Sequence, residues 1–112
     1  MAEVTFTVST YEVSLFRDGT GAGASSSFDA VVFLFGEGNT VFLHFLNSDS
    51  ITSNNFWFPN QKFGRIYMRR TLLPVVIDVL RNEKPVFCLM SDTVPGKCQI
   101  STSREPIGEG EV

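Results

Sequence analysis

The chain has 112 residues, of which 43% are hydrophobic and 19% are charged. This length and composition are those of one globular domain and exclude an intrinsically disordered chain. A net charge of −3 argues against nucleic-acid binding through the overall field of the protein. No apolar run approaches the roughly 18 residues of a membrane span. Eleven phenylalanines favour a packed core or an apolar interface, because phenylalanine has no polar group for ligand contacts.

The first half of the chain predicts strands. Residues 3–16 alternate between apolar and polar side chains and predict a strand that breaks near Ser9. Residues 18–27 are small and polar without periodicity, so we expect a mobile loop. Residues 28–35 and 40–47 are apolar runs around a Gly/Asn turn, which predicts a β-hairpin at the centre of the sheet with both faces covered.

The next segment predicts two short strands followed by a helix. Residues 56–58 and 64–70 have strand composition and follow a polar loop. The helix is expected over 71–82, because the Thr71 hydroxyl can cap its first turn and Pro74 lies within that turn.

The C-terminal part predicts a closing hairpin and a tail. Residues 85–91 and 97–103 are the expected arms of the hairpin, and residues 104–112 are an acidic, glycine-rich tail. Strands, one helix and further strands predict a single α+β domain over 1–112. We expect a mainly antiparallel sheet of about five to seven strands, with the helix packed on it.

The predicted helix is apolar on nearly every side, since Asp78 is the only charged residue between Leu72 and Leu80. A surface helix of a monomer shows one apolar stripe, so a second face needs a cover besides the protein's own sheet. We therefore expect a small, soluble, non-enzymatic binding or assembly domain that forms a two-fold homodimer. The expected interface residues are Leu72, Leu73, Val76, Val79 and Leu80, with Phe42 and Phe45 as sheet-side partners.

A basic and aromatic segment over 56–70 supports an alternative function. Four of the nine basic residues lie within positions 62–70, and aromatic side chains interleave with them. Aromatic rings beside cations are what single-stranded nucleic acid or an anionic ligand such as a nucleotide requires. The candidate ligand-binding residues are Trp57, Lys62, Arg65, Tyr67, Arg69 and Arg70. A solvated charged face explains the same pattern.

His44 is the only histidine and lies inside an apolar strand, which is typical of a core or interface residue. A further alternative is an enzyme in which His44 activates Cys88 or Cys98, although no spacing links these residues. Two cysteines and one histidine are a thin ligand set, so we expect no metal and no cofactor. The N-terminal residues lack the features of an export signal, and we expect a cytoplasmic protein with reduced thiols.

Overall fold

The computed structural model describes residues 2–103, which form eight strands and one helical segment. The elements are β1 Glu3–Thr7, β2 Thr10–Gly19, β3 Phe28–Gly36, β4 Asn39–Leu46, β5 Phe56–Phe58, β6 Phe63–Arg69, the 3₁₀ turn η1 Arg70–Leu72, α1 Leu73–Asn82, β7 Val86–Ser91, the 3₁₀ turn η2 Pro95–Lys97 and β8 Gln99–Thr102. The predicted α+β class is confirmed, and the predicted tail over 104–112 lies outside the described residues.

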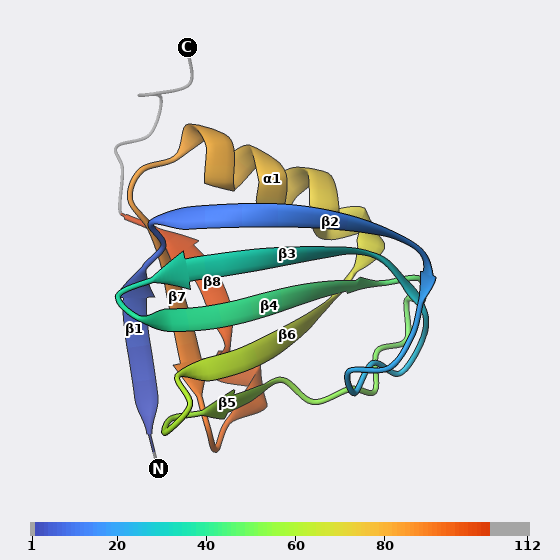
Figure 1. Ribbon diagram of the computed structural model, residues 1–112, viewed down its shortest axis with the longest axis horizontal. Helices are drawn as coiled ribbons and strands as arrows, with labels where there is room; N and C mark the ends of the chain where they lie inside the picture. Colours follow the sequence, from blue (N-terminus) through green and yellow to red (C-terminus); the bar gives the residue numbers. More distant parts are fainter. Residues whose placement is uncertain (1, 104–112) are drawn as a thin grey trace.

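The strands divide between two sheets, where the sequence predicts one. Their orders are β1-β7-β8 and β2-β3-β4-β6-β5, and every pair is antiparallel except β4–β6. Strands of the two sheets run across one another, with the five-stranded sheet nearer the viewer in Figure 1. This arrangement follows from the break predicted near Ser9, because β1 continues into one sheet and β2 into the other.

The crossing between the sheets is tied by backbone hydrogen bonds. The Val8 N–H donates to the carbonyl of Val86 in one sheet at 2.8 Å, and the Ser9 N–H donates to the carbonyl of Phe35 in the other at 2.8 Å. Gly36 lies against this corner, and a side chain there would collide with the carbonyl oxygen of Thr7. Glycine is therefore required where the end of β3 passes the backbone of Thr7.

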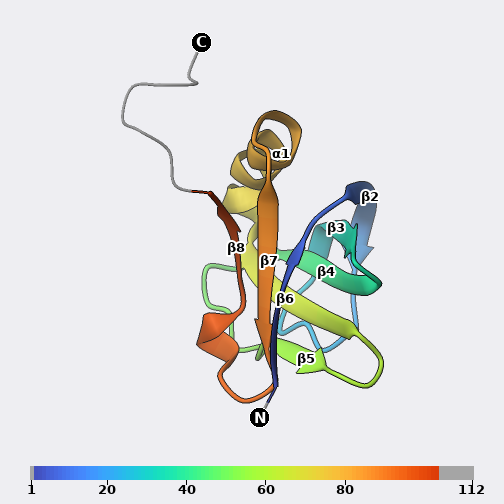
Figure 2. The ribbon, with the colours of Figure 1, turned by 90° about the vertical axis from the view of Figure 1, so that its left-hand side faces the viewer.

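The core lies between the two sheets and under the helix (Figure 2). Leu73, Val76, Ile77 and Leu80 of α1 pack against this core, and their spacing is that of one helical face. Within the described residues, no helix is long and apolar enough to cross a membrane.

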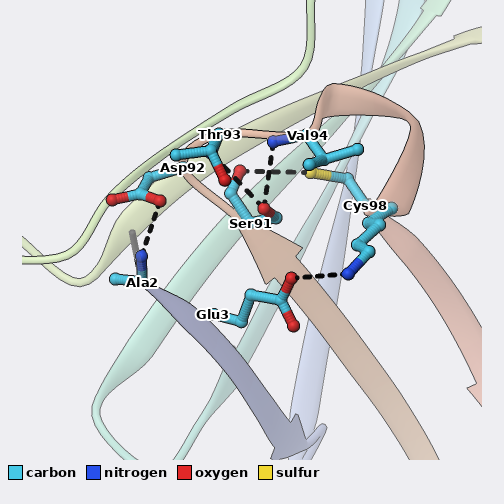
Figure 3. Close-up of polar contacts among 8 residues, drawn as sticks. Ala2, Glu3, Ser91, Asp92, Thr93, Val94 and Cys98 are labelled. Carbon is cyan, nitrogen blue, oxygen red and sulfur yellow. Dashed lines mark hydrogen bonds and ion pairs between the residues drawn. The ribbon is translucent and has the colours of Figure 1, made fainter.

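A polar network fixes the end of the three-stranded sheet (Figure 3). The buried Ser91 Oγ accepts hydrogen bonds from the backbone N–H groups of Thr93 and Val94 at 3.3 and 3.1 Å. Asp92 accepts a hydrogen bond from the Ala2 N–H at 2.7 Å. These contacts join the start of β1 to the turn after β7.

Phe45 should contribute far more to stability than Phe42, although both lie on β4. Phe45 is fully buried in the core, whereas Phe42 on the opposite face is half-buried. Phe45→Ala should lower the free energy of unfolding by about 3–5 kcal/mol because it leaves a closed cavity. Phe42→Ala should cost about 1–2 kcal/mol. Urea denaturation of the two variants measures both, and equal losses would contradict the burial of Phe45.

Candidate binding face

The outer face of the five-stranded sheet points away from the three-stranded sheet and carries most of the partly exposed aromatic rings. Strand pairing aligns its side chains in rows across the sheet. The central row consists of Glu12, Phe33, Phe42, Arg65 and Phe56. The outer row consists of Thr10, Phe35, Thr40, Phe63 and Phe58. These two rows are called the aromatic face below.

A third row, with Ser14, Val31, His44 and Tyr67, is covered by the loops 20–27 and 47–55. The Tyr67 hydroxyl donates to the carbonyl of Ala22, and the Tyr67 N–H donates to Asn55 Oδ1 at 2.8 Å. The loops also bond each other, because the Ser25 N–H donates to Ser53 Oγ at 2.6 Å. Ala24 and Ile51 of these loops pack on the same buried cluster as Phe33, Phe42 and Phe56 of the aromatic face.

The rings of the aromatic face contact one another edge to face. The centroids of Phe33 and Phe42 lie 4.6 Å apart, and those of Phe42 and Phe63 lie 5.0 Å apart. Phe56 and Phe58 extend the set with a centroid distance of 4.7 Å. Most of these rings are half-buried and Phe58 is 48% exposed. Because contiguous apolar patches on protein surfaces are often interaction sites, this face is the candidate site.

Arg65 is the cation of this face. Its guanidinium carbon lies 5.2 Å from the ring centroid of Phe42 and 5.0 Å from that of Phe63. Its Nη1 donates to His44 Nε2 at 2.7 Å. Arginine has only donors, so Nε2 is the acceptor and the imidazole proton is on Nδ1. Two rings and one hydrogen bond therefore hold the guanidinium in place.

Arg65 has no carboxylate partner within residues 2–103. The ion pairs of the described part join Arg70 to Asp29 at 3.1 Å and Lys97 to Glu3 at 3.0 Å. Arg65 is nevertheless only half-exposed. A positioned, partly desolvated guanidinium is well suited to bind a carboxylate or phosphate from outside the chain.

His44 is neutral because of its surroundings. It is 3% exposed, stacks on Tyr67 with centroids 5.4 Å apart, and meets the edge of Phe28 at 5.0 Å. Burial, followed by the positive charge of Arg65, lowers the pKa of His44 from 6.5 to about 4. Its Nδ1 is buried without a hydrogen-bond partner among the described residues. His44 therefore acts as a neutral acceptor that supports Arg65.

Only one of the six predicted ligand-binding residues lies on the aromatic face, and it is Arg65. Trp57 is 4% exposed and points into the core, while Tyr67 lies under the loops. Lys62 lies in the turn before β6, Arg69 is exposed at the end of that strand, and Arg70 pairs with Asp29. The structure thus disperses a cluster that is compact in sequence: Trp57 points to the opposite face, loops cover Tyr67, and the other three residues lie at or beyond the ends of β6.

The predicted helix interface is divided in a similar way. Leu73, Val76 and Leu80 pack on the protein's own core. Leu72 and Val79 line a groove of about 460 Å³ between α1 and β8, together with Met68, Val75 and Ile100. Of the sheet-side candidates, Phe45 is in the core and Phe42 is on the aromatic face.

His44 and Cys88 are not brought together. His44 lies on the outer face of the five-stranded sheet, and Cys88 lies in the core on the other side. Burial, with a smaller effect of Cys98, raises the pKa of Cys88 to about 12, and burial also raises the pKa of Cys98. Both thiols are therefore protonated and poorly nucleophilic. Residues 2–103 contain no group of three or more side chains able to hold a metal ion.

Sequence reasoning missed Glu12 and Phe33 as members of the face. A signal was present, because Glu12 alternates with Tyr11 and Val13 and so points away from them. Its position in a row with Phe33 depends on the register between β2 and β3, which the sequence pattern does not determine.

The single histidine should titrate near pH 4 in a proton NMR titration. Arg65→Met should raise the pKa of His44 but leave it below 6.5, since burial is the larger cause. The unfolded chain takes up this proton near pH 6.5, so stability should be lost as the pH falls from 6.5 towards 4, by at most about 3 kcal/mol. His44→Gln should lack that part of the pH dependence. A midpoint above pH 6 in the wild type would show that the imidazole is solvated.

Comparisons with protein families, curated proteins and solved structures found no match for this chain. Function is therefore argued from the aromatic face.

Proposed function

We propose that this protein is a non-enzymatic binding domain that contacts a protein partner through the aromatic face. The observation that carries the proposal is a contiguous set of half-exposed phenylalanines around Arg65, which has no carboxylate partner in the described chain. The centres of protein interfaces are enriched in aromatic residues and arginine and depleted of other charges. Binding hot spots often contain arginine.

The charge of the aromatic face favours a protein over a nucleic acid. Its central row carries one carboxylate, Glu12, and one guanidinium, Arg65. Nucleic-acid binding gains its affinity from several phosphate contacts, each made by a cation. A neutral face with one arginine offers too few of these contacts, and the whole chain adds a net charge of −3.

The packing of the rings supports binding energetically. Burying one phenylalanine contributes about 1.5–3 kcal/mol. Association costs about 4–15 kcal/mol in lost freedom, so several rings must be buried together. The aromatic face places its rings in two adjacent rows, where one partner surface can cover them at once.

A cytoplasmic location is part of this proposal. It is supported by Cys88 and Cys98, which are both free thiols and both buried. Free thiols are usual where the cell keeps cysteines reduced.

A photo-crosslinking amino acid at position 58 should trap a protein partner in cells of the source organism. Phe58 lies on the aromatic face and is 48% exposed, and Val75 on α1 is a matched control that is 57% exposed. We expect a discrete adduct from position 58, none from position 75, and loss of the adduct when Phe42 is changed to Ser. An adduct from position 75 alone would assign the contact to the helix groove. No adduct from either position would contradict the proposal.

A second candidate function is binding of single-stranded nucleic acid, favoured by the guanidinium of Arg65 above two rings. Stacked bases on such rings contribute about 1–3 kcal/mol each. For this function, fluorescence anisotropy with a labelled single strand must detect binding at low salt. The measured affinity must then fall steeply as the salt concentration rises. Arg65→Ala should then weaken the binding at least tenfold. Absence of binding at low salt would eliminate this candidate.

A further inference from the structure

We propose that the partner is a second copy of this chain, packed aromatic face to aromatic face about a two-fold axis. This inference rests on the proposed function, because it names the occupant of the same surface. It is carried by the order of side chains along the central row.

Four neighbouring members of the central row, on β2, β3, β4 and β6, carry opposite charges at their two ends. Glu12, Phe33, Phe42 and Arg65 lie on the adjacent strands β2, β3, β4 and β6, and each is the register partner of the next. Neighbouring strands are about 4.8 Å apart. Glu12 and Arg65 are thus three strand spacings apart, and the midpoint between them lies between Phe33 and Phe42.

A two-fold axis along the strands at this midpoint reverses the row in the second copy. Phe33 of one copy then lies over Phe42 of the other, and Glu12 lies over Arg65. The contact between Phe33 and Phe42 and the contact between Glu12 and Arg65 each occur twice, as a self-complementary two-fold interface requires. Sheets that pack face to face are about 10 Å apart and rotated by about 30°. The long side chains of glutamate and arginine can span the offset that this rotation creates at the ends of the row.

Neither charge has an oppositely charged partner among residues 2–103. Glu12 is exposed, and its carboxylate makes no hydrogen bond or ion pair with another residue among 2–103. Arg65 bonds His44 and has no carboxylate beside it. The rings of Phe33 and Phe42 separate the two charges in one copy. A second copy supplies the missing partner of each, next to rings that exclude water and strengthen the pair.

Charge reversal tests this arrangement by sedimentation equilibrium. The wild type should be a dimer, and Glu12→Arg and Arg65→Glu should each weaken dimerisation at least tenfold, because each places like charges in both contacts. An equimolar mixture of the two variants should form a heterodimer, since opposite charges then meet in both contacts. The double variant should dimerise by itself for the same reason. Asp78→Arg, an exposed reversal on α1, is the control and should leave the dimer unchanged.

Each outcome has one interpretation. Circular dichroism confirms that the variants are folded, and Glu12→Arg keeps the test valid if Arg65→Glu does not fold, because the side chain of Glu12 makes no polar contact in the described chain. A wild-type dimer that both reversals leave intact would overturn the inference. A monomeric wild type whose position 58 crosslinks a different protein would overturn the inference and leave the proposed function standing.

Discussion

The structure depends on one constraint: the hairpin of β3 and β4 is apolar on both of its faces. The three-stranded sheet and α1 cover the inner face, where Val32, Leu43 and Phe45 are fully buried. Among the described residues, the outer face receives only the two loops, which bond each other and cover the end near His44. Polar loops satisfy their own backbone groups by remaining short and partly solvated, so they do not extend over the whole sheet. The remaining rings form the aromatic face.

Arg65 adds a directional contact to this apolar surface. Phenylalanine rings alone accept many partners and orientations, because hydrophobic contact is non-directional. A guanidinium held by two rings and by neutral His44 adds a contact with fixed geometry. The low pKa of His44 fits its role as the acceptor for Arg65, since a protonated imidazole would repel the guanidinium. His44 in the covered third row thus holds the guanidinium of Arg65 in the exposed central row.

Local features of the fold could be predicted from the sequence, and pairings between distant segments could not. The break near Ser9, the β3–β4 hairpin and the helix around Pro74 follow from alternation, turn residues and the proline in the first helical turn. The predicted cap by the Thr71 hydroxyl is not formed, because α1 begins at Leu73 with Leu72 as its N-cap residue. The pairing of β1 with β7 and the parallel pairing of β4 with β6 depend on tertiary packing. The candidate site shows the same division. Arg65 was identified from its basic neighbours, yet its actual neighbours Phe42 and His44 come from a strand about twenty residues earlier.

In the proposed dimer, the order of charges in the central row would also select between alternative orientations of the two copies. A two-fold axis across the strands, instead of along them, would place Glu12 over Glu12 and Arg65 over Arg65. Like charges in a partly desolvated contact are costly, so this second arrangement is disfavoured. Open stacking of many copies is disfavoured as well, because one closed two-fold contact in the proposed dimer covers the rings of β3, β4 and β6. In the proposed dimer, Glu12 and Arg65 would thus restrict a surface of phenylalanines, which would otherwise promote aggregation, to one partner in one orientation.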